Sequence, residues 1–161
     1  MDGFVAWVQA TRLSHAIVYT TWIWPACETI HFIGLALVIG AAGFFDLRLL
    51  GFFKRIPVAA ARELTRFALA GFLLNLFTGL IFLVGHPEQY AHNVAWWAKV
   101  GFLAAAGINA VAFETVVAPP AMRIEDGDTP VAAKAVGFVS LIAWFGVLYW
   151  GRMLPFIGSA F

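Results

Sequence analysis

The chain of 161 residues is strongly apolar, because 62% of its residues are hydrophobic and only 12% are charged. An ordinary soluble domain has about twice that charged fraction, so most of this protein's surface is suited to lipid. Ten Lys and Arg residues nearly balance nine Asp and Glu residues, which leaves no net field to attract nucleic acid. The single cysteine, Cys27, excludes an intrachain disulfide bond, a CxxC motif and a thiolate metal cluster.

Residues from about 3–22 form an apolar stretch in which Gln9, Arg12 and His15 recur at every third position. A helix would gather these polar residues on one side, which predicts a helix lying in the membrane interface. The alternative is a short fifth span, in which Arg12 would be costly unless it were paired. Asp2 stands where a secretory signal has a basic residue, so we expect this N-terminus to be retained.

Four further segments are long enough to cross about 30 Å of hydrocarbon, which requires roughly 20 helical residues. They cover residues of about 26–50, 64–84, 96–118 and 131–154. Pro25 precedes the first segment, and Pro119 with Pro120 ends the third. Thr129 is suited to cap the fourth, with Pro130 at its first helical position. We therefore predict an all-α fold, a single membrane domain formed by a four-helix bundle with an N-terminal interfacial helix.

The basic residues are distributed unevenly between the two ends of this bundle. Seven lie in or beside the first and third loops: Arg48, Lys54, Arg55, Arg62, Arg66, Arg123 and Lys134. The opposite end holds only Arg12, Lys99 and Arg152. By the positive-inside rule the first group is cytoplasmic, so both termini and the central loop face outward. Trp and Tyr residues gather at the predicted outer boundary, as expected of an aromatic belt.

Small residues and asparagines recur at spacings of four on the second and third spans. The two sets are Gly71, Asn75 and Gly79, and Gly101, Ala105 and Asn109. Each set lines one helix face, where it lets two backbones approach while the Asn side chains hydrogen-bond across the gap. We interpret these faces as packing faces rather than as a ligand channel, and they would also suit a homo-oligomer.

Ionisable side chains inside a membrane are energetically expensive, so each requires an explanation. Several lie near helix ends on the predicted cytoplasmic side: Asp46, Arg48, Arg62, Arg66 and Glu114. We interpret them as an interhelical ion-pair cluster. All four histidines fall instead in the predicted outer half: His15, His31, His86 and His92. Glu28 lies three residues before His31, but this single ExxH is only half of a di-iron site, so no di-iron centre is expected.

A b-type haem is the sharper hypothesis, because neutral imidazole is a standard axial ligand. His31 would be one ligand, with His86 or His92 opposite, and Glu28 shares this side. Small residues that would make room for the macrocycle follow His31, namely Gly34, Ala36 and Gly40. Membrane haem proteins usually have both histidine ligands within spans. His86, however, precedes Pro87 in a turn, and His92 lies in a polar loop, which argues against either as the second ligand.

Other functions remain open at this point. Copper or zinc could be bound by His31, His86, His92 and a carboxylate. Each histidine could also be a hydrogen-bonded interfacial or loop residue, in a scaffold or accessory subunit where Glu28, His31 and Lys99 form a buried network. A haem protein would pass electrons to quinone or to another membrane redox complex. The sequence contains no HExxH motif, phosphate-binding glycine loop or serine-histidine-acid arrangement.

Two motifs carry a resemblance to a known family. The stretch W-P-A-C-E-T-I-H-F-I-G at 24–34 and D-L-R-L-L-G at 46–51 resemble a family of small, uncharacterised bacterial inner-membrane proteins. Tyr90, Asn93 and Lys99 fit that family's Y-x-x-N-x-x-x-x-x-K element, so the resemblance covers about the first two-thirds of the chain. It implies a bacterial inner membrane and no particular activity. It singles out Glu28, His31, Asp46, Arg48, Tyr90, Asn93 and Lys99.

The first span is also similar, less specifically, to membrane copper-resistance and cytochrome b-like proteins, whose helices place a histidine before small residues. This second similarity is too loose to predict a cofactor for this chain.

Overall fold

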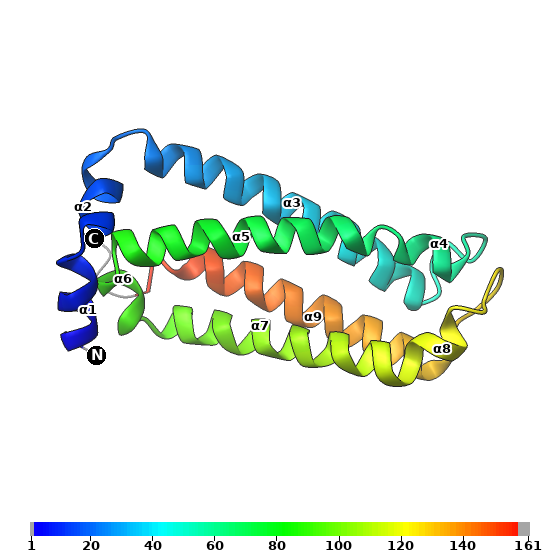
Figure 1. Ribbon diagram of the computed structural model, residues 1–161. Coiled ribbons are helices and arrows are strands. Elements are labelled where there is room, and N and C mark those ends of the chain that lie inside the picture. Colours follow the sequence, from blue (N-terminus) through cyan, green and yellow to red (C-terminus); the bar gives the residue numbers. More distant parts are fainter. Residues whose placement is uncertain (1, 158–161) are drawn as a thin grey trace.

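The computed structural model describes residues 2–157, which form helices joined by short connections and contain no β-strand (Figure 1). Four stretches are long and apolar enough to cross a membrane: Ile23–Leu49, Val58–Gly85, Val94–Ala121 and Val131–Met153. The predicted all-α, four-helix membrane bundle is confirmed, and the protein is a multi-pass membrane protein.

The long helices are α3 (Ile23–Leu49), α5 (Thr65–Gly85), α7 (Val94–Ala112) and α9 (Val131–Met153). Each begins within three residues of its predicted start. Short elements extend or connect them: α4 (Val58–Arg62) leads into α5, α6 (Glu88–Ala91) lies in the central loop, and a π-helical turn (Phe113–Val117) with α8 (Ala118–Ala121) continues α7. The end of the bundle that carries α6 is called the α6 end, and the opposite end is called the α8 end.

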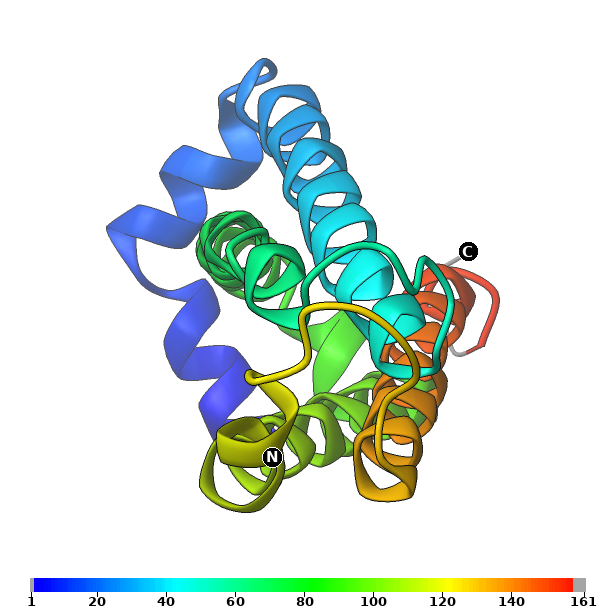
Figure 2. The ribbon, with the colours of Figure 1, turned by 90° about the vertical axis from the view of Figure 1, so that its right-hand side faces the viewer.

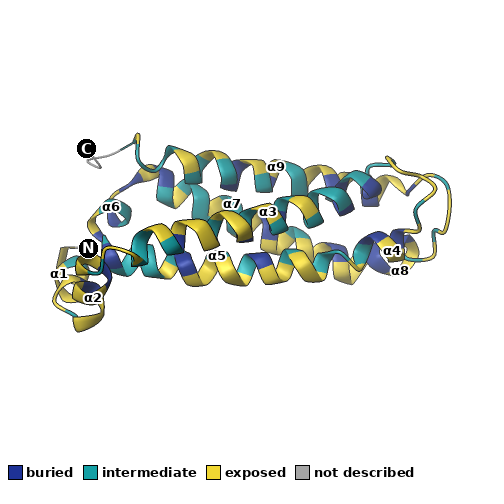
Figure 3. Ribbon diagram, turned by 90° about the horizontal axis from the view of Figure 1, so that it is seen from above, coloured by how far each residue is buried: buried dark blue, intermediate teal, exposed yellow. Residues whose placement is uncertain are grey.

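The four long helices pack in a particular order. Helix α3 packs along α5 and also against α9, which in turn packs along α7, whereas α5 and α7 have no extensive contact with each other. Figure 2 shows this arrangement from the α8 end. Large apolar side chains are exposed on all four long helices (Figure 3). For example, Phe77, Ile108 and Phe145 are 64%, 71% and 69% exposed. Lipid is the solvent that suits such a surface.

The N-terminal segment forms two helices, α1 (Asp2–Gln9) and α2 (Arg12–Tyr19), where a single helix over about 3–22 was predicted. Thr11 causes the break, because its extended backbone caps α2 and its hydroxyl accepts a hydrogen bond from the Ser14 N–H at 3.1 Å. Both helices lie across the α6 end and are too short to span a membrane (Figure 1). This excludes the alternative of a fifth span.

The third span continues beyond the predicted boundary at Pro119 and Pro120. Neither proline has an N–H with which to bond a carbonyl of the preceding turn. The helix widens just before them, and the Ala118 N–H bonds to the Phe113 carbonyl, five residues back. Such π-helical turns are a recognised way to absorb a broken hydrogen-bond ladder.

The start of the fourth span differs by one residue from the prediction. Pro130 is the N-cap of α9, and Thr129 precedes the helix. The Thr129 hydroxyl donates instead to the carbonyl of Leu49, at 2.5 Å. It therefore joins the C-terminal turn of α3 to the beginning of α9.

Helices α3 and α5 are in close backbone contact at Gly34 and Gly71. A Cβ on Gly34 would lie 2.8 Å from the Gly71 carbonyl oxygen, so neither position has room for a side chain. One turn further along α5, the Asn75 amide nitrogen donates to the His31 carbonyl at 2.7 Å, and its oxygen accepts from the Leu35 N–H at 3.1 Å. The face of Gly71 and Asn75 therefore packs on the first span.

The corresponding face of the third span pairs with the fourth. The Asn109 amide donates to the Val136 carbonyl on α9 at 3.1 Å. A Cβ added to Gly79 or to Gly101 would meet nothing within 4 Å, so these two glycines do not mediate close packing. Asn75 and Asn109 thus join two different helix pairs.

Candidate functional site

His31 is half-buried on α3, and its Nδ1 atom lies 2.7 Å from the hydroxyl of Thr78 on α5. The Thr78 side chain is fully buried, and its hydroxyl donates to the Leu74 carbonyl at 2.8 Å. A hydroxyl has one proton and a carbonyl can only accept, so this assignment makes His31 Nδ1–H the donor to Thr78. The other ring nitrogen, Nε2, is then left with its lone pair.

Aromatic side chains separate His31 from His86. The Phe82 ring lies 5.6 Å from the His31 ring and 4.8 Å from the Trp24 ring, between ring centroids. Trp24 in turn meets the edge of His86 at 5.1 Å. Thr78 and Phe82 lie one turn apart on one face of α5, and His86 is the C-cap of this helix, so the outer end of α5 contacts α3 through these residues.

Glu28 does not join His31, although the two residues were predicted to share a helix face. Its side chain is exposed, and its carboxylate accepts a hydrogen bond from Trp24 Nε1 at 3.1 Å. Trp24 lies one turn before Glu28, so the carboxylate is held near the helix start. The predicted buried network of Glu28, His31 and Lys99 is therefore not formed through Glu28.

The two loop histidines each have a carboxylate partner. His86 Nδ1 lies 3.2 Å from Glu88 Oε1, and His92 Nε2 lies 3.1 Å from Asp2 Oδ1. The second Glu88 oxygen accepts from Gln9 Nε2 at 2.8 Å. These contacts join α1 to the central loop. Within residues 2–157, no three His, Cys, Asp or Glu side chains are grouped as a metal site requires.

Lys99 on α7 lies close enough to act electrostatically on His31. Its ammonium lies 5.9 Å from the centre of the Trp96 ring, and a Cβ added to Gly151 of α9 would lie 3.8 Å from Nζ. In the part of the chain that the structure describes, no carboxylate or hydrogen-bond acceptor pairs with this ammonium. His31 on α3 and Lys99 on α7 thus bring an imidazole and an amine to the same part of the bundle.

Tyr90 lies in α6, and Asn93 lies at the start of α7. Burial, with the Glu88 carboxylate adding to it, raises the pKa of Tyr90 to about 12, and its ring packs on the edge of Trp96 at 5.0 Å. Asn93 caps α7, because its side-chain oxygen accepts from the Ala95 N–H at 2.9 Å. Its amide nitrogen donates to the Leu154 carbonyl at 3.0 Å, so Asn93 joins the start of α7 to the end of α9.

The D-L-R-L-L-G motif lies at the α8 end, where Arg48 is fully buried. Its Nε donates to the Ile56 carbonyl at 2.5 Å, and Nη2 donates to the carbonyls of Lys54 and Gly127 at 3.4 and 3.3 Å. One guanidinium therefore holds both loops of this end together.

The remaining charged residues of the α8 end do not form one cluster, which corrects the predicted interhelical group. Arg62 pairs with Glu114 at 2.5 Å, whereas Arg66 pairs with its neighbour Glu63 at 3.9 Å. Asp46 is buried, and its carboxyl faces Ser140 of α9 with one oxygen unpartnered. Residues two apart on a helix point to different sides, so Asp46 and the Arg48 of its own motif serve different contacts.

Sequence reasoning missed Thr78 and Asp128. Thr78 extends the Gly71 and Asn75 face by almost one turn and carries a hydroxyl in an apolar span, which is the signal that could have identified it. Asp128 bonds to Lys134 at 2.8 Å and lies 3.7 Å from Lys54.

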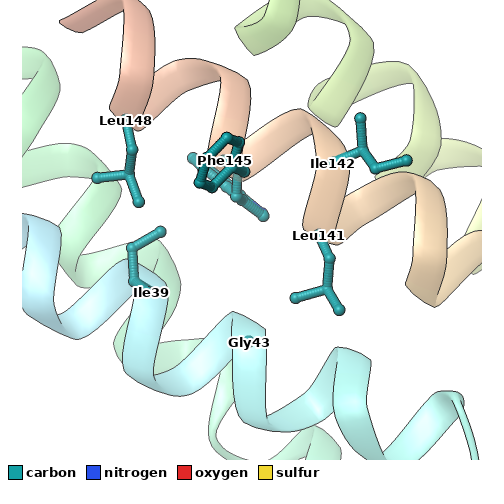
Figure 4. Close-up of a pocket in the computed structure, with 7 residues that line it drawn as sticks. Ile39, Gly43, Leu141, Ile142, Phe145 and Leu148 are labelled. Carbon is teal, nitrogen blue, oxygen red and sulfur yellow. The ribbon is translucent and has the colours of Figure 1, made fainter. Parts of the chain in front are cut away.

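An apolar groove of about 420 Å³ lies between α3 and α9 (Figure 4). Side chains of Ile39, Leu141, Ile142, Phe145 and Leu148 line it together with Gly43. None of these residues can bind a metal or exchange a proton, so the groove is suited to lipid chains and is not the candidate site.

Comparison of the chain with protein-family models, with curated proteins and with solved structures finds no match. The candidate site is therefore argued from its geometry alone. Its chemically useful side chains are those of His31, Thr78 and Lys99.

Proposed function

We propose that this protein is a small membrane redox protein that binds b-type haem through His31. The observation that carries the proposal is the hydrogen bond from His31 Nδ1–H to Thr78. A histidine that ligates a metal commonly donates its second ring N–H to a neighbouring acceptor, which sets the tautomer and the ring orientation. His31 meets that requirement inside the bundle, with Nε2 left as the ligand atom.

Lys99 supports the same reading. A cation held inside a membrane protein without a carboxylate partner is energetically costly unless an anion is bound beside it. The propionate groups of haem are anions of this kind. Lys99 would therefore fix the orientation of the haem while His31 holds its iron, and the bound haem would supply one-electron transfer.

The proposal uses His31 as the protein ligand and assigns no ligand role to His86 or His92. Each of those histidines is hydrogen-bonded to a carboxylate of its own, and Phe82 and Trp24 stand between His86 and His31. Gly34 was expected to make room for the macrocycle, but Gly71 and Asn75 of α5 occupy the space beside it. A haem bound to His31 would therefore have to lie on a side of the ring away from Gly34.

We further propose that the protein resides in a bacterial inner membrane with its α6 end outward. The seven basic residues of the predicted cytoplasmic group surround the α8 end, as the positive-inside rule requires. The resemblance of the W-x-P-x-x-E-x-x-H-x-x-G and D-L-R-L-L-G motifs to bacterial inner-membrane proteins supports the location. Electrons would then pass at the outer side, to or from quinone or another membrane redox complex.

An absorption spectrum tests the haem proposal directly. The protein, purified in mild detergent, is expected to have a Soret band that shifts with dithionite and is lost in His31→Ala. His92→Ala is the matched control and should keep the band. A Soret band that survives in His31→Ala would contradict the proposal. Stoichiometric copper or zinc without the band would favour metal handling, and the absence of both would favour a scaffold or accessory subunit.

A further inference from the structure

A second cavity, of about 230 Å³, lies at the α6 end between α2 and the end of α5. Its chemically distinctive lining residues are His15 and Tyr19 from α2, and His86 and Glu88 from the end of α5 and the start of α6. It contains no Lys or Arg. The cavity is open to the surface, and its volume exceeds the roughly 150 Å³ of an enclosed cavity that admits benzene, so a substituted six-membered ring can enter it.

His86 and Glu88 form a hydrogen-bonded pair at the wall of this cavity. An ionised carboxylate can only accept, so the 3.2 Å contact requires that His86 Nδ1 carries the proton. Nε2 is then an acceptor for a hydroxyl group. A histidine oriented by a carboxylate is the arrangement by which proteins accept a proton from a hydroxyl, because the carboxylate stabilises the imidazolium that would form.

The part of the lining that α2 contributes is aromatic and exposed. The rings of His15 and Tyr19 are stacked, with centroids 5.5 Å apart and planes 27° apart. Tyr19 and Trp22 are 76% and 68% exposed, as expected of residues at the membrane interface. A ligand that suits both sets of lining residues is therefore a flat ring with a hydroxyl group, which would reach the cavity from the bilayer.

We propose that this cavity binds the head group of a membrane hydroquinone, whose hydroxyl donates to His86 while its ring packs beside His15 and Tyr19. A phospholipid head group fits less well, because the lining offers no cation for its phosphate. The inference deepens the proposed function and rests on it only for the fate of the electrons, since binding itself requires no haem.

Equilibrium binding of decyl-hydroquinone tests the proposal. The full chain in nanodiscs is titrated without oxygen by calorimetry, and empty nanodiscs provide the baseline. We expect one saturable site per chain and at least tenfold weaker binding for His86→Phe. His92→Phe is the matched control, because it breaks a similar pair of histidine and carboxylate, His92 with Asp2, outside the cavity. If His86→Phe does not fold, Glu88→Gln replaces it, with weaker binding again expected.

Three results would overturn the proposal: a titration equal to that of empty nanodiscs, equal affinity for the wild type and His86→Phe, or displacement of the hydroquinone by ethanolamine phospholipid. The last result would assign the cavity to a lipid head group. The heat of binding does not depend on a Soret band. A missing haem spectrum and a failed titration are therefore separate outcomes.

Discussion

His31 and Thr78 lie on facing helices, and the 2.7 Å contact between Nδ1 and Oγ1 holds the imidazole in one orientation. The Thr78 hydroxyl is itself held by the Leu74 carbonyl at 2.8 Å, so the orientation of the ring derives from the backbone of α5. A positioning residue of this kind acts on a bound metal through the histidine rather than by contact with it.

Thr78→Val should therefore weaken haem binding while it leaves the volume of the site unchanged. Loss of the oxygen removes the acceptor for Nδ1–H, and substitutions of this type reduce metal affinity by about 10–100-fold. Titration of the haem-free protein with haem, followed at the Soret band, measures the effect. Thr78→Ser keeps the hydroxyl and should bind like the wild type. Equal affinities of the Val and Ser variants would show that Thr78 has no such role.

Gly71→Ala should destabilise the bundle, by about 1–3 kcal/mol. A Cβ at this position would lie 2.8 Å from the Leu37 Cβ and 3.0 Å from the Val38 backbone nitrogen, and the backbone atom cannot rotate away. Gly79→Ala, in the same helix with nothing within 4 Å, is the control. Thermal unfolding in one detergent compares them. If both variants unfold together at the wild-type temperature, α3 and α5 do not pack through Gly71.

Arg48→Met should loosen the two loops of the α8 end. The substitution keeps an apolar stem of similar length but leaves the carbonyls of Ile56, Lys54 and Gly127 without their donor, at a cost of about 2–3 kcal/mol. Arg55→Met, at an exposed position in the same loop, should have little effect. Limited proteolysis of the loops and thermal unfolding measure both changes. Equal protease resistance of the two variants would contradict this role of Arg48.

Acidification should break the contact of Asp128 at the α8 end. The Lys134 ammonium and then the Thr129 N–H hold the pKa of this carboxyl below its ordinary value of 3.8. Because the pKa is lowered in the folded protein, the contribution to stability is present above pH 3.8 and is lost as the pH falls through the lower folded value. A carboxyl NMR titration should give a midpoint below 3.8, and Lys134→Met should raise it. A midpoint unchanged by Lys134→Met would refute the assignment.

The orientation in the membrane can be tested with engineered cysteines. Cys27 is buried, so it should contribute little labelling of its own. In intact cells, a membrane-impermeant maleimide should label His92→Cys at the α6 end and should label Glu125→Cys at the α8 end only after the cells are broken. The reverse pattern would place the α8 end outside and would remove the proposed access from the outer side.

The bundle itself could be predicted from the sequence because lipid leaves few alternatives. A segment of about 20 apolar residues in a bilayer must satisfy its backbone hydrogen bonds internally, so it forms a helix whatever its neighbours are. The four spans follow from this rule, and so does the break that charge and glycine impose near residue 51. Thr11 escaped prediction because a single capping hydroxyl outweighed the continuous apolar pattern around it.

Only the tertiary structure decided which side chains meet. Helical periodicity places Gly71, Asn75 and Thr78 on one side of α5, but lipid is as apolar as a neighbouring helix, so hydropathy cannot say which helix this side contacts. The close approach at Gly34 settles it and brings Thr78 to His31. Glu28 is the opposite case. Helical spacing predicted that its carboxylate lies beside His31, but the carboxylate bonds to Trp24 on the same helix instead.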